Sequence, residues 1–207
     1  MRFDTEINGI NISLDTGDYY FSPDEIDRGT LAMLSAVEAS VEDKILDLGC
    51  GYGIVGIYLV KLTGGARIVM SDVSEDAVRL SEDNLRLNGV TSARVVLSDG
   101  LSGVEDDDFT LILSNPPYHT DFKVAKGFIE NGFKKLKTGG KMLMVTKRLD
   151  WYKNKLISVF GGVRIKEIDG YYVFEAEKRT DKMPGKKKPA NKLSKKLQRK
   201  MNRERGG

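Results

Sequence analysis

From residue 40 onward, short apolar runs alternate with longer segments in which apolar residues recur every three or four positions. The runs have the length of buried strands, and the longer segments have the spacing of amphipathic helices. This pattern predicts strands at 44–47, 66–70, 94–97, 109–113 and 141–145, and helices at 54–62, 74–87, 124–136 and 151–160. Alternation of strand and helix predicts an α/β fold, in which a mostly parallel sheet has helices on both faces.

A β-hairpin is predicted at each end of this alternating region. The first lies within residues 1–20, where Asn8-Gly9 separates two short runs. The second joins 163–168 to 171–176 around Asp169-Gly170. Asn-Gly and Asp-Gly favour two-residue hairpin turns. The C-terminal hairpin brings the predicted sheet to seven strands, of which the last two are antiparallel.

One more helix is predicted between the first hairpin and the first parallel strand. Ser22 is a candidate N-cap, with Pro23 in the first helical position and Glu25 in the third. This combination forms a capping box. Apolar residues between 26 and 37 follow at helical spacing. We therefore expect this helix to begin at Pro23.

The charges are divided unevenly along the chain. Of 33 Lys/Arg and 30 Asp/Glu, residues 178–207 hold 13 bases and two acids, and residues 1–177 hold 20 bases and 28 acids. A basic tail on an acidic body is typical of proteins that bind nucleic acid or, second, an anionic membrane surface. A solvated tail without a partner is the alternative. We expect a hairpin extension at 1–20, a catalytic domain at 21–179 and a basic tail at 180–207.

Composition excludes several classes of protein. A hydrophobic content of 40% in 207 residues is enough to form a core. The single cysteine, Cys50, excludes an intramolecular disulfide and a multi-cysteine metal site. The sequence shows neither a signal peptide nor the ~20 consecutive apolar residues that a membrane-spanning helix needs. We therefore expect a cytoplasmic protein.

A glycine-rich loop follows the first predicted strand. Gly49, Gly51 and Gly53 follow Asp47 and precede a helix. The free N–H groups at the start of that helix therefore face any ligand that the loop binds. Together with Gly56, the loop also matches the dinucleotide fingerprint, which fits NAD as well as other adenosine ligands.

Three carboxylates come at the ends of predicted strands: Asp47, Asp72 and Asp99. Ligands of an open α/β sheet bind outside the carboxyl ends of its strands. A pyrophosphate would gain nothing from three neighbouring carboxylates. A ligand with an ammonium, a sulfonium, a ribose diol and an adenine amine would gain from each. Each aspartate alone is also a common turn residue, but the three together favour a positively charged adenosine ligand.

The fourth predicted strand leads into a rigid turn. Asn115 is followed by Pro116, Pro117, Tyr118 and the only histidine, His119. Two prolines fix the backbone and remove two N–H donors. The acceptors that remain, the Asn115 side-chain oxygen and the Pro116 carbonyl, suit a substrate –NH2 group, and Tyr118 offers a flat face for a planar base. A stiff turn without a function is the alternative.

These motifs carry a resemblance to a known family. Asp-Leu-Gly-Cys-Gly-Tyr-Gly at 47–53 and Asn-Pro-Pro-Tyr at 115–118 resemble class I S-adenosylmethionine-dependent methyltransferases that modify amines. Residues 21–30 and 114–119 are similar, more narrowly, to the catalytic domain of ribosomal RNA small-subunit guanine-N2 methyltransferases, a methyltransferase small domain. The resemblance covers about residues 20–178. It implies a Rossmann-like fold, S-adenosylmethionine as cofactor, and an exocyclic amine of an RNA base as substrate, guanine N2 of ribosomal RNA first.

The resemblance also implies a role for each matching residue. The cofactor site comprises three carboxylates, the glycines beside them and two further residues: Asp47, Gly49, Gly51, Gly53, Asp72, Val73, Asp99, Gly100 and Asn115. Within this site, Asp47 and Gly49 hold the methionine end, Asp72 accepts from the ribose, and Asp99 accepts from the adenine amine.

A second set of residues is expected to act on the substrate. The resemblance implies that the turn presents the target amine through Asn115, Pro116 and Tyr118. Further substrate contacts are expected from Phe21, Pro117, His119 and Lys147. The sulfonium methyl is already activated, so we expect no metal and no dedicated general base. Catalysis then consists of alignment, and of stabilising the positive charge that develops on the amine.

Four alternatives are weighed against an RNA methyltransferase. A release-factor glutamine N-methyltransferase uses the same turn, but it carries a helical N-terminal domain and a longer insert after the turn. A DNA adenine methyltransferase needs a target-recognition segment, for which the chain has no room. A non-catalytic nucleic-acid-binding module would not need the intact Asn115 turn, and a dinucleotide oxidoreductase would bind NAD. The base, its position in the RNA and the oligomeric state stay open.

Overall fold

The main feature of the fold is a seven-stranded sheet with the strand order β5-β4-β3-β6-β7-β9-β8. The structure is a computed structural model that describes residues 2–17, 26–117 and 122–184. The strands are β3 (Lys44–Leu48), β4 (Arg67–Asp72), β5 (Ala93–Leu97), β6 (Phe109–Ser114), β7 (Leu136–Thr146), β8 (Arg164–Ile168) and β9 (Tyr171–Glu177). Strands β3 to β7 are mutually parallel, and β9 is antiparallel to both β7 and β8. This arrangement confirms the predicted fold class.

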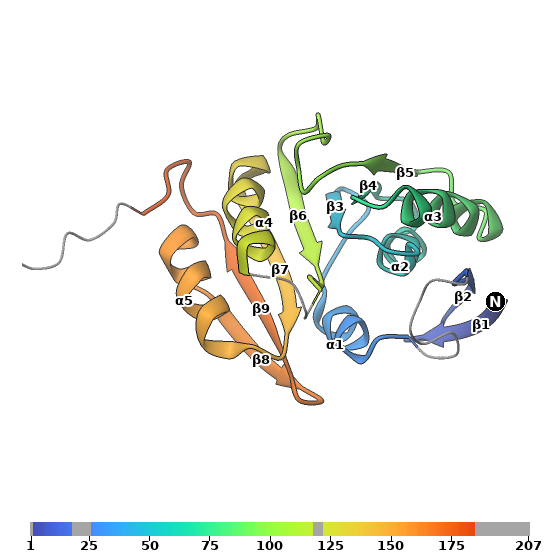
Figure 1. Cartoon of the computed structure of the whole chain (residues 1–207), viewed down its shortest axis with the longest axis horizontal. Coiled ribbons are helices and arrows are strands. Elements are labelled where there is room, and N and C mark those ends of the chain that lie inside the picture. Colours follow the sequence, from blue (N-terminus) through green and yellow to red (C-terminus); the bar gives the residue numbers. More distant parts are fainter. Residues whose placement is uncertain (1, 18–25, 118–121, 185–207) are drawn as a thin grey trace, which may run out of the picture.

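Five helices of the described residues pack on the two faces of this sheet (Figure 1). They are α1 (Arg28–Ala36), α2 (Ile54–Thr63), α3 (Glu75–Leu87), α4 (Phe122–Lys135) and α5 (Leu149–Phe160). Successive strand residues point to opposite faces. Ile45 therefore packs in one core with α1, α2 and α3, whereas Leu46 packs in a second core with α4 and α5. Because both faces are covered, the central strands are apolar throughout.

The N-terminal hairpin packs against α2 and α3 (Figure 1). It consists of β1 (Arg2–Ile7) and β2 (Ile10–Asp15), joined by a turn in which Asn8 and Gly9 both have positive φ, as the sequence predicts. The side chains of Asn84 in α3 and of Asn88, the C-cap of this helix, bind the backbone of β2. Buried Asn84 accepts from the Asp15 N–H at 2.7 Å and donates to its carbonyl at 2.8 Å, and Asn88 bonds Ser13 in the same way. The hairpin is thereby fixed to the helices.

The predicted start of the first helix is wrong. Helix α1 begins at Arg28, and Ile26 lies outside it. Its cap is Asp27, whose side chain accepts from the Thr30 N–H at 2.8 Å. The proposed cap, Ser22, lies outside the described residues. An aspartate three residues before a backbone N–H is as good an N-cap as serine, and here it also binds a residue of the functional site.

The predicted start of the strand at 141–145 is also wrong. Helix α4 ends at Lys135 and β7 begins at the next residue, so both glycines lie within an eleven-residue strand. The register between β6 and β7 shifts in this region. A Cβ at position 140 would stand 2.8 Å from the Phe109 carbonyl oxygen, so glycine permits this close approach. The ladder with Lys178 continues across it.

Candidate functional site

The carboxyl ends of β3, β4, β5 and β6 surround a cavity of about 420 Å³. The cavity brings together eight of the predicted site residues, which come from four different loops: Gly49, Gly51, Asp72, Val73, Asp99, Gly100, Asn115 and Pro117. It is also lined by Leu48, Ser71, Ser98, Val124 and Phe128, which the sequence analysis does not single out. Parallel register explains this convergence, because all of these strands end at the same edge of the sheet.

The glycine loop is anchored to the neighbouring strand by backbone hydrogen bonds. The N–H groups of Gly49 and Cys50 both donate to the Ser71 carbonyl, at 2.8 and 3.0 Å. Gly53 caps α2 with a φ of 92°. A Cβ on Gly56 would stand 2.5 Å from the Met70 sulfur. Gly56 therefore lets α2 pack directly on β4, which brings the helix start up to the cavity.

Asp47 lies beneath the loop and does not line the cavity. Its side chain is buried and accepts from the Gly56 N–H at 3.2 Å. Gly53 offers no side-chain cap to α2, so this carboxylate takes a free N–H group of the first turn instead. Burial, together with the charge of Asp72, raises the pKa of Asp47 to about 7.

Asp72 lies at the end of β4 and links the loop to α3. One carboxylate oxygen accepts from the Gly51 N–H at 3.0 Å, and the other accepts from the Ser74 N–H at 3.0 Å. Each oxygen has further lone pairs for ligand hydroxyls. The next residue, Val73, is 68% exposed. An exposed apolar side chain next to an acceptor suits a ligand with a flat apolar ring and a diol.

Asp99 and Gly100 follow β5, the strand next to β4, and line the cavity together with Phe128 of α4. Ideal Cβ atoms at Gly49 and Gly100 would lie 3.9 and 3.7 Å from the Phe128 ring. The ring therefore fills the space between two loops that come from different strands. The Asp99 side chain is exposed at the rim, where it can accept from a ligand amine.

The Asn115 side chain is held in one orientation from across the sheet edge. Its amide nitrogen donates to Asp27 Oδ2 at 2.7 Å and to Thr30 Oγ1 at 3.0 Å. Because both amide hydrogens are used on α1, the oxygen is the end of the group that can accept a hydrogen from a substrate. Pro116 is buried and Pro117 is exposed. The turn is therefore held both by its prolines and by α1.

The remaining predicted residues fall into two groups. Phe21, Tyr118 and His119 lie outside the described residues. Lys147 does not line the cavity; it follows β7 at the same sheet edge, with its ammonium 4.8 Å from the centre of the Tyr171 ring. Gly53 and Pro116 lie outside the cavity lining as well.

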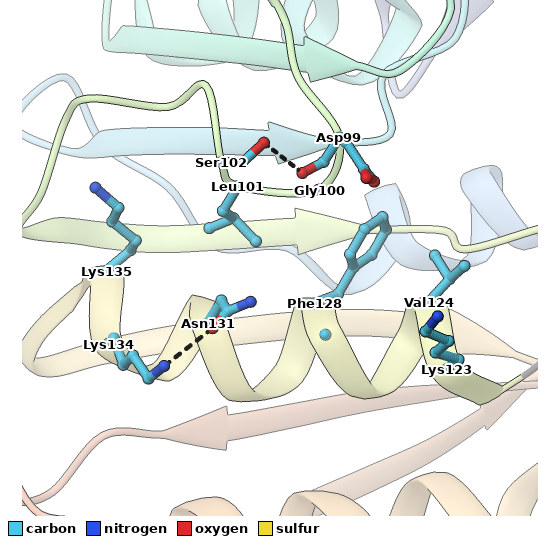
Figure 2. A pocket seen from close by; sticks show the side chains of 11 residues that line it. Asp99, Gly100, Leu101, Ser102, Lys123, Val124, Phe128, Asn131, Lys134 and Lys135 are labelled. Carbon is cyan, nitrogen blue, oxygen red and sulfur yellow. Dashed lines mark hydrogen bonds between the residues drawn. The ribbon is translucent and has the colours of Figure 1, made fainter.

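A second cavity, of about 630 Å³, adjoins the first (Figure 2). The two share Asp99, Gly100, Val124 and Phe128. Its other side is α4, where Lys123, Asn131, Lys134 and Lys135 line it and Lys134 donates to the Asn131 side chain at 3.1 Å. The outer rim of the site is thus basic along α4.

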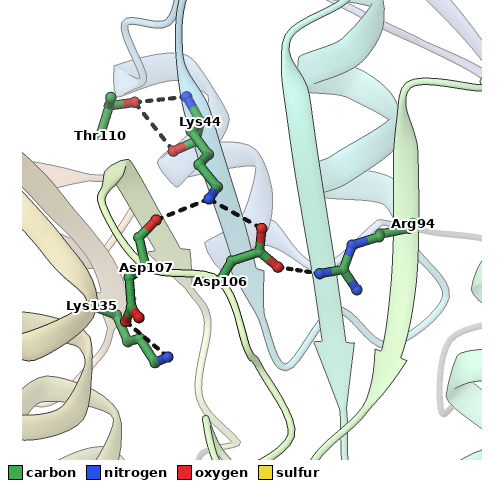
Figure 3. Close-up of polar contacts among 6 residues, drawn as sticks. All are labelled: Lys44, Arg94, Asp106, Asp107, Thr110 and Lys135. Atoms are coloured by element: carbon green, nitrogen blue, oxygen red, sulfur yellow. Dashed lines mark hydrogen bonds and ion pairs between the residues drawn. The ribbon is translucent and has the colours of Figure 1, made fainter.

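Ion pairs fix the far end of the connection that carries Asp99 (Figure 3). Asp106 pairs with Lys44 at 3.1 Å and with Arg94, and Asp107 pairs with Lys135 at 2.9 Å. Lys44 also donates to the Asp107 carbonyl at 2.9 Å. These contacts connect the segment between β5 and β6 to β3, β5 and α4, and they fix the position of its second half.

The sequence motifs do not indicate the two residues that orient Asn115. The spacing of Asp27 and Thr30 indicates a helix cap, and that signal could have been found. Their contact with Asn115 spans more than 80 residues, and no local pattern predicts it. Ser71 is missed as well; its buried hydroxyl has no hydrogen-bond partner among the described residues.

Comparison with known proteins defines the family. A family model described as "Methyltransferase small domain" matches residues 11–175. The chain belongs to this family. It is 35% identical to YbxB of Bacillus subtilis, an uncharacterized protein, over 76% of this chain and 82% of that protein. It is also 35% identical to ribosomal RNA small subunit methyltransferase C of Pseudoalteromonas atlantica, over 70% of this chain but 43% of that protein. The chain thus spans about half the length of the named RNA methyltransferases that it matches.

The solved structures agree with this assignment. The 16S rRNA N2 G1207 methyltransferase of Thermus thermophilus, in complex with AdoMet and guanosine, superposes with a TM-score of 0.80 at 26% identity. The match covers 86% of this chain and 50% of that one. The chain is therefore a class I S-adenosylmethionine-dependent methyltransferase.

The cavity fits this cofactor. Its floor is a glycine cradle, and its two carboxylates, Asp72 and Asp99, face a ligand that carries positive charge and hydrogen-bond donors. The buried Ser71 hydroxyl at the cavity wall offers one more polar contact. The volume of about 420 Å³ lies within the range usual for small-molecule sites. Among the described residues, no group of three or more His, Cys, Asp or Glu is placed to hold a metal ion.

Asp47 should make the stability of the fold depend on pH. Its pKa rises from the ordinary 3.8 to about 7 on folding, so this residue favours the folded state below pH 4 and loses that contribution as the pH rises to 7. Asp47→Asn keeps an acceptor for Gly56 and cannot ionise. The difference in unfolding free energy between Asp47→Asn and wild type should grow by up to about 1.4 kcal/mol per pH unit across this window. Urea denaturation from pH 4.5 to 8 measures it, and parallel curves for the two proteins would refute the shift.

Asp72→Ala should weaken S-adenosylmethionine binding by about 10- to 150-fold, because it removes a charged acceptor of about 1.5–3 kcal/mol. It also releases the Gly51 N–H. Asp76→Ala is the matched control, since Asp76 lies on the first turn of α3 and pairs with exposed Arg79. Titration calorimetry with S-adenosylhomocysteine measures both variants. Equal affinity in both would show that Asp72 does not bind the cofactor.

Proposed function

We propose that this protein transfers a methyl group from S-adenosylmethionine to an exocyclic amine of a nucleobase in RNA, and that the amine is guanine N2 of ribosomal RNA. The observation that carries the proposal is the fixed orientation of Asn115. Its amide nitrogen is engaged by Asp27 and Thr30, and its side chain lines the cofactor cavity. The kinship with ribosomal RNA small subunit methyltransferase C supports an RNA substrate.

The chain's own residues account for the chemistry without a base. S-adenosylmethionine supplies a methyl group that is already activated by its sulfonium. The Asn115 oxygen and the Pro116 carbonyl accept the two hydrogens of the target –NH2, which directs the nitrogen lone pair along one line. As the N–CH3 bond formed, the S–CH3 bond would break and S-adenosylhomocysteine would leave. Positive charge would develop on the nitrogen, fixed oxygens would stabilise it at no cost of reorganisation, and the nitrogen would then release one proton to solvent. Alignment supplies most of the remaining rate enhancement.

The proposal is tested by methyl transfer to an unmodified small-subunit ribosomal RNA transcript, offered naked and assembled in the subunit. Digestion to nucleosides and mass spectrometry should show N2-methylguanosine. A release factor offered in parallel tests the amide alternative, because a glutamine –NH2 fits the same pair of acceptors. Methylglutamine without modified RNA would overturn the RNA assignment, and binding of the cofactor without any methyl transfer would favour a non-catalytic module.

Asn115→Ala should lower turnover of that reaction by ~10²–10³ and change cofactor affinity little, because the oxygen acts on charge that develops in the transition state. Asn154→Ala is the matched control, since Asn154 is an exposed asparagine on α5 and should keep full turnover. Single-turnover rates at saturating cofactor separate the chemical step from binding. Near-normal rates in Asn115→Ala would exclude the acceptor role.

We further propose that the basic tail raises the affinity for RNA without choosing the base. Met183 packs against the second core, and the structure describes the chain as far as Pro184, so the truncation that tests the tail removes residues 185–207. The truncated chain should fold and bind the cofactor normally. Each lost phosphate contact should make the slope of log affinity against log salt shallower by ~0.7–0.9. RNA binding by both forms across a salt series measures this, and identical slopes would leave the tail without a role in RNA binding.

A further inference from the structure

The two halves of the sheet differ in charge. Residues 1–121 contain 8 Lys/Arg and 22 Asp/Glu, whereas residues 122–177 contain 12 and 6. The second group forms α4, β7, α5, β8 and β9, which lie together at one side of the molecule (Figure 1). Although residues 1–177 carry a net negative charge, residues 122–177 carry a net positive one. This basic half of the sheet can therefore itself attract a polyanion.

Two cations of this half stand beside the Asn115 turn. Strand β7 pairs with β6 so that Met144 lies opposite Ser114. Neighbouring strands are about 4.8 Å apart, and Lys147 and Arg148 follow β7 directly. Both side chains are exposed. In the strand order, they stand on the side of Asn115 that faces away from the cofactor cavity.

Aromatic rings hold these cations in place. The Arg148 guanidinium lies 5.0 Å from the centre of the Phe122 ring, and Phe122 stacks on Trp151 with 4.4 Å between ring centres. Lys147 lies 4.8 Å from the Tyr171 ring centre. Phe122 and Trp151 are half-buried at the ends of α4 and α5 that adjoin the turn. The two charges are thus preorganised at an exposed edge, which lowers the entropy lost on binding.

We propose that this cation–aromatic edge (Phe122, Lys147, Arg148, Trp151 and Tyr171) binds the phosphates of the RNA strand adjacent to the target nucleotide. The inference rests on the proposed RNA substrate and names the surface that grips it. Arg148 contacts a phosphate through its planar guanidinium group. The Phe122–Trp151 stack fixes the orientation of this group. Lys147 adds a second point charge. Because these contacts touch phosphates, they position the strand and carry no base specificity.

The test uses full-length protein and an unmodified small-subunit ribosomal RNA transcript. The double variant Lys147→Ala, Arg148→Ala should make the slope of log affinity against log salt shallower by ~1.4–1.8, because two phosphate contacts are lost. Lys137→Ala is the matched control: Lys137 is an exposed lysine near the amino end of the same strand, β7, and its slope should equal that of wild type. The double variant should raise KM for RNA and keep the maximal rate.

A conservative variant separates charge from geometry. Arg148→Lys keeps the charge but loses the planar fork, so it should keep the wild-type salt slope while its affinity falls several-fold. Trp151 is the only tryptophan, so its emission confirms folding in every variant and should change when RNA arrives. If the RNA is methylated while the double variant keeps the wild-type slope and KM, the edge is not the binding surface and the proposed function stands. If the wild type modifies a release-factor glutamine and no RNA, the proposed function fails and this inference fails with it.

Discussion

The parallel register of the three central strands is the constraint on which the site depends. In β3, Asp47 lies opposite Met70 of β4 and Leu113 of β6. The three strands therefore end at the same level of the sheet. The glycine loop, Asp72 and the Asn115 turn, which follow these strands, lie side by side. A shift of one residue in any strand would turn its buried side chains to the opposite face. The apolar cores on both faces thus protect the geometry of the edge.

Buried side-chain amides connect this edge to the N-terminal part of the chain. Asn84 binds the backbone of Asp15 in the hairpin, and its nitrogen also donates to the Tyr52 carbonyl in the glycine loop at 2.8 Å. Asp27 performs a comparable task at the other side of the cavity, since it caps α1 and holds Asn115. An amide that is buried without its partners would cost roughly 1–3 kcal/mol. Each clamp therefore strongly favours one arrangement of segments that lie far apart in sequence.

Sequence pattern predicts the sheet well because each strand is marked by its own composition. The predicted and observed ends of the strands agree to within about two residues, except at the start of β7. The turns at Asn8-Gly9 and Asp169-Gly170 have the left-handed backbone that these pairs favour. The errors have physical causes. The glycines at 139 and 140 favour a break locally, but their hydrogen bonds with Lys178, the residue after β9, keep them in a strand. The role of Asp27 toward Asn115 and the position of Asp47 beneath the loop depend on packing, which no local spacing encodes.

The division of charge across the sheet matches the two ligands that the proposed RNA methyltransferase has to bind at once. S-adenosylmethionine is cationic at its reactive end, and the cavity proposed to bind it is lined by the carboxylates of Asp72 and Asp99. An RNA strand is anionic, and the cations of the other half stand beyond Asn115. A protein with one sign of charge throughout would bind one of the two ligands more weakly. Because the opposite charges lie on opposite sides of one turn, we infer that each half attracts its own ligand. In the proposed reaction, the nitrogen and the methyl group then meet at the boundary between the two halves.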